Sequence, residues 1–234
     1  MPRCDDVLVE DRLRELSVRL RGPARLKSDL LTEARHGLLD AVEAYRASGL
    51  PAAEAERRAV AEFGSPAQLL PAWQAELAVG ALRGLSVRVL ALAAFLTVAG
   101  DLTWRGSSWS SDGPHPPAGY HLLSQSVNGI WLGALALSVA GLLLVTLAAR
   151  SAHPAGAVLA RLVGAALTGL LALGVLAGAA LFGWSIGLWD AALTWPPMIV
   201  GMVVVGAGYA WVGRAARAWL LATLTPGRPV PAGR

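Results

Sequence analysis

The run VNGIWLGALALSVAGLLLVTLAA at residues 127–149 decides the fold, because it carries no charged side chain. An α-helix rises about 1.5 Å per residue, so this run is long enough to cross a hydrocarbon layer of about 30 Å. Within hydrocarbon the backbone must satisfy its own hydrogen bonds, which favours a helix. We therefore predict a membrane-spanning helix at residues 127–149.

Three similar apolar runs, at residues 85–104, 157–182 and 194–212, predict three further spans. The first run contains Arg88 about one turn from its start, where a long side chain can extend back to the membrane surface. The run at 157–182 is long enough to tilt in the membrane. We expect an all-α protein with a four-helix transmembrane bundle at residues 81–213.

The residues before the first span have a different composition. Of the 20 Lys and Arg and the 16 Asp and Glu in the chain, 12 and 13 respectively lie between Met1 and Arg83. The remaining part holds 8 Arg and 3 Asp, so the net charge of +4 comes from Arg residues that border apolar runs. This distribution argues against direct nucleic-acid binding, which would need a basic face on the soluble part.

The Arg residues also predict the orientation. Flanks rich in Arg remain in the cytoplasm, and only Arg105 falls on the opposite side of the four predicted spans. The first residues, MPRCDDVLVEDR, lack the apolar core of a signal peptide. We expect a multi-pass protein of the cell membrane with both termini in the cytoplasm. The Arg residues on the cytoplasmic side are Arg83, Arg88, Arg150, Arg161, Arg214, Arg217, Arg228 and Arg234.

Tryptophan side chains gather on the opposite side of the predicted spans. Amphipathic rings favour the headgroup zone, so an aromatic belt is the main interpretation and a ligand-binding cage is the alternative. The members are Trp104, Trp109, Trp184, Trp189 and Trp195.

Residues 1–80 are predicted to form a small cytoplasmic helical domain. Apolar residues recur at helical spacing in two stripes, which end at the breakers Gly22-Pro23 and Ser48-Gly49. Both stripes are narrow, so each helix needs a packing partner. The first stripe is Val9, Leu13, Leu16 and Leu20, and the second is Leu31, Ala34, Leu38, Val42 and Tyr45.

A third and a fourth helix follow in this domain. Pro51 opens the third at its first position and Gly64 ends it, with Ala55, Ala59 and Phe63 on one face. Ser65-Pro66-Ala67-Gln68 is a capping box, in which the Ser hydroxyl and the Gln side chain each satisfy a free backbone amide. Only Gly80 and Gly84 separate this fourth helix from the first span. A rigid connection, bending at the two Gly and a plain linker all remain open.

A resemblance to a known family rests on Leu20 to Pro66, which read LRGPARLKSDLLTEARHGLLDAVEAYRASGLPAAEAERRAVAEFGSP. The ordered features are an Arg-Gly-Pro entry, an Asp-Leu-Leu helix, a Gly-Leu-Pro turn and the ending Glu-Phe-Gly-Ser-Pro. This segment resembles permease prefix domain 1, a small helical domain related to the HAAS signalling domain.

The resemblance implies a cytoplasmic adaptor ahead of membrane helices. Such adaptors precede the permease part of ABC exporters, or belong to small multi-pass proteins whose genes often neighbour a PadR-like transcription regulator. This chain departs from the exporter form, because residues 105–126 are too few for the large extracytoplasmic domain that those permeases carry. The signalling form is therefore favoured, and the composition suits a bacterial source.

No motif for catalysis accompanies these helices. The sequence has no Gly-rich phosphate-binding loop, no His-Glu-x-x-His and no Gly-x-Ser-x-Gly, so we expect no enzyme, no catalytic residue and no cofactor. Asp112, His115 and His121 lie close together in the first outer loop, but three donors among Pro and Gly favour a plain surface loop over a metal site. Cys4 is the only cysteine, which excludes an internal disulfide.

The predicted spans offer few polar groups for a transport pathway. Ser138, Thr146 and Thr168 are expected to bond carbonyls of their own helices, which argues against an ion-coupled transporter.

Small residues such as Gly129 and Gly133 permit close helix packing, either within the bundle or in a homo-oligomer. Residues 214–234 are expected to form a basic amphipathic segment on the inner leaflet and a disordered tail.

These observations favour a non-enzymatic regulatory or accessory protein in the lipid bilayer. Its N-terminal domain would bind a cytoplasmic protein partner, for which the resemblance suggests a PadR-like transcription regulator. The alternative is a transport component, either a reduced permease subunit that works with a separate ATPase or a small exporter. A neighbouring gene for a winged-helix regulator would favour the first function, and a gene for an ATPase would favour the second.

Overall fold

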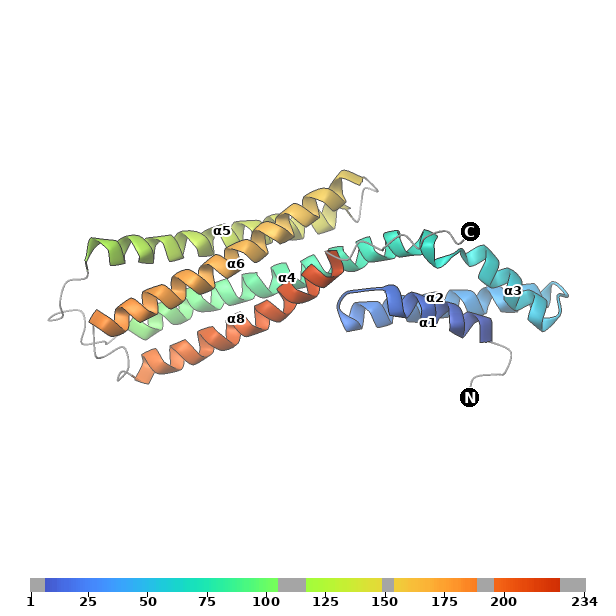
Figure 1. The fold of residues 1–234 in the computed structure, drawn as a ribbon, viewed down its shortest axis with the longest axis horizontal. Coiled ribbons are helices and arrows are strands. Elements are labelled where there is room, and N and C mark those ends of the chain that lie inside the picture. The colour runs from blue at the N-terminus through green and yellow to red at the C-terminus, as the bar shows by residue number, and fades with distance from the viewer. Residues whose placement is uncertain (1–6, 105–116, 149–153, 189–195, 224–234) are drawn as a thin grey trace, which may run out of the picture. The chain divides into compact units, whose positions relative to one another are not determined.

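The computed structural model describes residues 7–104, 117–148, 154–188 and 196–223 (Figure 1). All regular secondary structure in these ranges is helical, and four of the helices are long and apolar enough to cross a membrane. The prediction of an all-α protein with four long apolar helices is therefore confirmed. The helices are α1 (Val7–Arg19), α2 (Ala24–Ala47), α3 (Ala52–Phe63), α4 (Pro66–Trp104), α5 (Ala118–Ala148), α6 (Pro154–Leu188) and α8 (Pro196–Thr223).

The chain divides into two compact units. Unit 1 comprises Met1–Ala81 together with Ala218–Arg234, and unit 2 comprises Leu82–Arg217. Helix α4 contributes to both units, since it continues without interruption from Pro66 to Trp104. Neither Gly80 nor Gly84 interrupts it.

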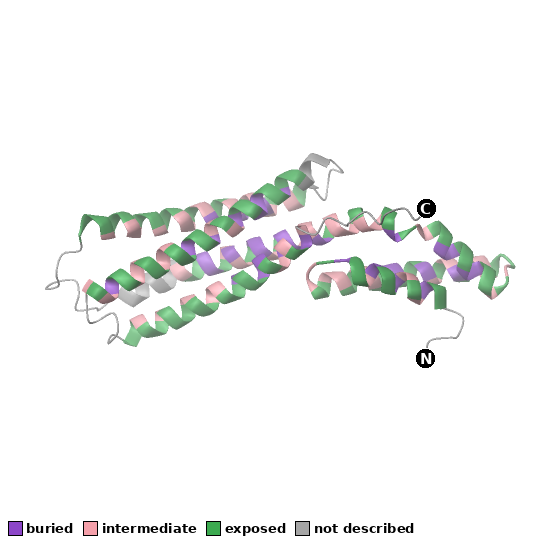
Figure 2. Cartoon of the chain, viewed as in Figure 1, coloured by how far each residue is buried: buried purple, intermediate pink, exposed green. Residues whose placement is uncertain are grey.

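Unit 1 has a hydrophobic core of its own, formed where α1, α2 and α3 pack against one another. Buried positions follow the faces that these helices turn toward each other (Figure 2). Phe63 extends the core toward α4 by an edge-to-face contact with Trp73, with ring centroids 6.0 Å apart. The stripes predicted from helical spacing are thus confirmed as buried faces. The core consists of Val9, Leu13, Ala34, Leu38, Val42, Ala55, Ala59 and Val60.

The breaks between these helices occur at the expected residues. Gly49 and Gly64 adopt φ values of 97° and 101°, in the left-handed region that residues with a Cβ avoid. Pro51 stands one position earlier than predicted, because it is the N-cap of α3 and Ala52 is the first helical residue.

The capping box at the start of α4 forms only in part. Gln68 Oε1 accepts a hydrogen bond from the Ser65 backbone N at 2.9 Å, as predicted. The Ser65 hydroxyl, however, donates to the same Gln68 oxygen at 2.9 Å, and the predicted bond from a backbone amide to this hydroxyl is not formed. The amide of Gln68 bonds the Ser65 carbonyl instead, at 3.0 Å.

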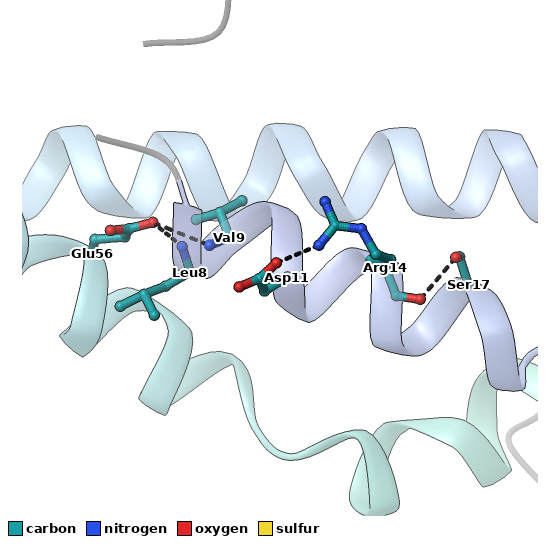
Figure 3. Close-up of polar contacts among 6 residues, drawn as sticks. All are labelled: Leu8, Val9, Asp11, Arg14, Ser17 and Glu56. Carbon is teal, nitrogen blue, oxygen red and sulfur yellow. Dashed lines mark hydrogen bonds and ion pairs between the residues drawn. The ribbon is translucent and has the colours of Figure 1, made fainter. Parts of the chain in front are cut away.

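A buried carboxylate caps the first helix (Figure 3). Glu56, on α3, accepts hydrogen bonds at Oε1 from the backbone N of Leu8 at 2.6 Å and of Val9 at 3.1 Å. The first amides of a helix have no partner within it, and a negative charge is favourable at its N-terminus. Glu56 therefore fixes the start of α1 onto α3 across 48 residues of sequence.

Unit 2 is built from long helices in direct contact. Helices α5 and α6 pack along each other, and Trp131 on α5 lies against Tyr209 on α8 with ring centroids 5.7 Å apart. The predicted hydroxyl bonds are confirmed, because Ser138 donates to Ala134 O at 2.7 Å and Thr168 to Gly164 O at 2.8 Å.

The outer faces of these helices are apolar. Large side chains are exposed along α5, α6 and α8, which appear mostly green in Figure 2. Apolar surface of this extent is unfavourable in water and favourable against lipid. This exposure agrees with the four candidate membrane spans. Examples are Leu132, Leu143, Leu162, Leu173, Leu176, Val200 and Val203.

The last helix extends beyond the predicted fourth span. Helix α8 continues through residues 213–223, and Trp219 and Ala222 are buried, at 3% and 2% exposure. A single Gly213 does not end the helix, because the residues after it are good helix formers. The final turns of α8 belong to unit 1.

Replacing Glu56 tests the importance of the carboxylate cap. We expect Glu56→Ala to accelerate amide exchange in α1 by about 10- to 30-fold, because two amides lose a charged acceptor. Hydrogen exchange of the full-length protein in detergent, followed by mass spectrometry of peptides from residues 7–19, measures this effect. Glu54→Ala is the control, since Glu54 is exposed on the same helix and pairs only with Arg57 among the described residues. Equal acceleration in both variants would contradict the proposed role.

Candidate functional site

Among the described residues, the side chains that the sequence suggests for metal binding do not form a cluster. Asp112 and His115 lie outside the described residues, as does Cys4. His121 is exposed on α5, with its ring centroid 6.5 Å from that of Tyr120. Within the described ranges, no three His, Cys, Asp or Glu side chains come close enough to hold a metal ion.

Among the clustered tryptophans, only Trp184 has a described side chain. Its ring meets Tyr120 edge to face at 6.0 Å, and the Tyr120 hydroxyl lies 3.0 Å from Ser185 Oγ. A Cβ on Gly119 would lie 2.9 Å from the Trp184 ring, so the backbone of α5 approaches α6 closely there. In the described residues Trp184 therefore serves helix packing.

The most distinctive polar arrangement in unit 1 is centred on Gln74 of α4. Gln74 Oε1 accepts from the backbone N of Arg21 at 3.0 Å, and Nε2 donates to the Arg21 carbonyl at 2.6 Å. The same Nε2 donates to the carbonyl of Ala222 at 2.7 Å. The half-buried side-chain amide of Gln74 thus connects α4 to two other segments, the α1–α2 connection and the last turn of α8.

Each backbone group that Gln74 binds lacks a helical partner. Arg21 lies between α1 and α2, and the Ala222 carbonyl belongs to the final turn of α8, where carbonyls are left without intrahelical bonds. Close packing supports the contact, because a Cβ built on Gly22 would lie 3.4 Å from Leu77 and 3.7 Å from Ala222. We call Gln74, Arg21 and Ala222 the Gln74 junction.

The sequence interpretation did not single out Gln74. Its partners are 53 and 148 residues away, so no local motif marks it. One signal was present, however. Gln74 follows Trp73 and stands three residues before the apolar Leu77, on a helix face that should be buried.

A second feature of unit 1 is an exposed polar contact between α2 and α3. The Tyr45 hydroxyl donates to Glu62 Oε2, and Arg58 Cζ lies 5.3 Å from the Tyr45 ring centroid. The hydrogen bond to Glu62 raises the pKa of Tyr45 above 10.0, desolvation and the Glu62 charge add to this increase, and Arg58 opposes it. The phenol therefore stays protonated and in contact with Glu62 at neutral pH.

The outward face of α2 carries acidic side chains. Their spacing of 4, 7 and 3 residues places them along one side of the helix, and all are exposed. Among the described residues, none of them forms an ion pair. We call this set the α2 acidic face; it consists of Asp29, Glu33, Asp40 and Glu43.

Comparison with protein-family models, curated proteins and solved structures finds no match for this chain.

Replacing Gln74 tests the junction. We expect Gln74→Leu to increase amide exchange in residues 20–24 and 218–223 by about 5- to 30-fold, because three backbone groups lose their partner. Gln74→Glu should cause at least as large an effect, since it keeps the acceptor but brings a negative charge against the carbonyl oxygens of Arg21 and Ala222, to which Gln74 donates. Exchange mass spectrometry of the intact protein measures both variants.

The matched control for this test is Gln68→Leu on the same helix. Gln68 bonds only Ser65 through its side chain in the described residues, so its loss should leave residues 218–223 unchanged. Exchange at wild-type rates in Gln74→Glu would show that the junction does not hold the end of α8.

Proposed function

We propose that this chain is a membrane-bound regulatory or accessory protein whose α1–α3 bundle binds a cytoplasmic protein partner. The main support is that the α1–α3 bundle has a core of its own, and that α4, which begins in unit 1, is also the first of the long apolar helices. Such a domain can present a protein-binding surface beside the membrane without a catalytic centre. The resemblance of Leu20 to Pro66 to permease prefix domain 1 suggests a PadR-like transcription regulator as the partner.

The α2 acidic face is the surface that we assign to partner binding. Its side chains are exposed and do not contribute to the core, so charge there is available for an intermolecular contact. Complementary charges accelerate association and exclude partners of the wrong sign. The surface therefore fits a partner that presents basic residues.

A charge-reversal variant tests this function. Full-length protein and the triple variant Asp29→Lys, Glu33→Lys, Asp40→Lys are purified from native membranes, and co-purifying proteins are identified by mass spectrometry. We expect the wild type to recover a transcription regulator and the variant to lose at least about 90% of it, because three contacts of about 0.5 kcal/mol or more become repulsive.

The control variant is Asp11→Lys, Glu15→Lys, which reverses exposed charges on α1. It should retain the partner. Recovery of an ATPase with its own phosphate-binding loop, in place of a regulator, would contradict this proposal and support the transport alternative. Equal loss in both variants would show that the α2 acidic face has no specific role.

The same function requires unit 1 on the cytoplasmic side. We propose that both termini are cytoplasmic, on the basis of the Arg residues that flank the apolar helices. In a Cys4→Ser background, Ser108→Cys should react with a membrane-impermeant maleimide in intact cells, and Ser151→Cys should react only after permeabilisation. Labelling of both sites in intact cells would contradict this orientation.

A further inference from the structure

Arg88 is a charged residue within the apolar part of α4, where an isolated guanidinium is unfavourable. Its Cζ lies 5.7 Å from the centroid of the Trp211 ring on α8. Its Nη1 lies 3.5 Å from Gly84 O, which is a long contact for a hydrogen bond. A guanidinium has five N–H donors, so among the described residues most of its donors remain available.

The packing of α4 on α8 gives the level of Arg214 along the helix axis relative to Arg88. A Cβ on Gly208 would lie 2.5 Å from Leu92 Cδ1, so the two helices touch closely at that level. One turn away, Arg88 meets Trp211, which shows that the helices run antiparallel. The next turn therefore brings residue 214 level with Gly84, toward which the Arg88 side chain is directed.

Burial along α8 agrees with this register. Val212 and Ala215 are buried, whereas Trp211 and Arg214 are exposed. Trp211 and Arg214 are three residues apart, so they are neighbours on the helix surface. Arg88 and Trp211 consequently border one edge of the contact between α4 and α8, and Arg214 follows Trp211 on the exposed side, about 120° around the axis from Gly208.

No carboxylate in the described part of unit 2 neutralises this edge. The acidic residues after Arg83 are Asp101, Asp112 and Asp190. Asp101 is 13 residues beyond Arg88 on the same helix, about 20 Å along its axis. Asp112 and Asp190 lie outside the described residues. The positive charge at this edge therefore favours an anion from the surroundings.

We propose that Arg88, Trp211 and Arg214 bind the phosphate of an anionic phospholipid headgroup. A guanidinium binds two phosphate oxygens at once, and an indole ring is favourable at the level of the headgroups. Basic sites between transmembrane helices are suited to acidic lipids. This inference does not depend on the proposed protein partner.

Native mass spectrometry of the full-length protein tests the site. The protein in detergent is titrated with dioleoyl phosphatidylglycerol and, separately, with dioleoyl phosphatidylcholine. We expect tighter binding of phosphatidylglycerol, and about a fivefold weaker affinity for it in Arg88→Gln and in Arg214→Gln. Arg88→Lys should show an intermediate affinity, because it keeps the charge but loses the planar donors.

Arg83→Gln is the matched control. It removes the same charge from the same helix, but residue 83 is rotated by about 140° from residue 88 around the axis, so affinity should change less than about twofold. If the Arg83 variant weakens binding as much as the Arg88 variant, general surface charge is responsible and the site is refuted. Unchanged affinity in Arg88→Gln would also refute it.

Two further measurements separate the remaining explanations. Inorganic phosphate at millimolar concentration should not displace the lipid; displacement would show a site for small anions in place of a lipid site. The Tm of each variant is measured in phosphatidylglycerol nanodiscs and in phosphatidylcholine nanodiscs. The increase in Tm that phosphatidylglycerol causes should be smaller for Arg88→Gln than for Arg83→Gln. An equal difference in the two variants would overturn the proposal even if both are less stable than the wild type.

Discussion

Hydrocarbon offers no hydrogen-bond partner, and this constraint determines the form of unit 2. Its backbone is helical throughout the described apolar ranges, and Ser138 and Thr168 bond carbonyls within their own helices. Ser86 differs, since its Oγ is the buried side-chain oxygen without a hydrogen-bond partner among the described residues. It lies 2.8 Å from the position of a Cβ on Gly141. A weak contact with the Gly141 Cα–H fits this arrangement and marks a close approach of α4 and α5.

The charged side chains at the surface of unit 1 face a different constraint, because water competes with them for hydrogen bonds and ion pairs. Its exposed ion pairs, such as Glu15 with Arg19, therefore add little stability. Polar groups contribute more where they replace water at helix ends. Glu56 provides such a group for α1, and Gln74 provides one for the end of α8. The two side chains connect helix ends that are 48 and 148 residues apart from them in sequence.

Much of this fold could be predicted from spacing alone. The buried faces of α1 and α2 follow the 3.6-residue period, so Leu13 and Leu38 were correctly predicted to be buried. The four long apolar helices were predicted from the length of the apolar runs. Glu56 and Gln74 could not be found in this way, because their partners are distant in sequence and a side chain's position in space is not encoded in its neighbours. Glu54 and Glu56 are similar in local sequence, but Glu56 stands three, four and seven residues before Ala59, Val60 and Phe63, a spacing that places it beside the buried face of α3.

Gly80 and Gly84 lie within α4 without ending it, although glycine is a common helix breaker. A Gly within a helix costs about 1 kcal/mol relative to Ala, which is less than the loss of several backbone hydrogen bonds at a break. Gly80 also has a packing role, because a Cβ there would lie 2.8 Å from Leu26 Cδ1 of α2. Bending at Gly80 would have to separate α4 from Leu26 as well as break helical bonds. The lack of a side chain at Gly80 therefore allows α2 to pack closely against α4 within unit 1.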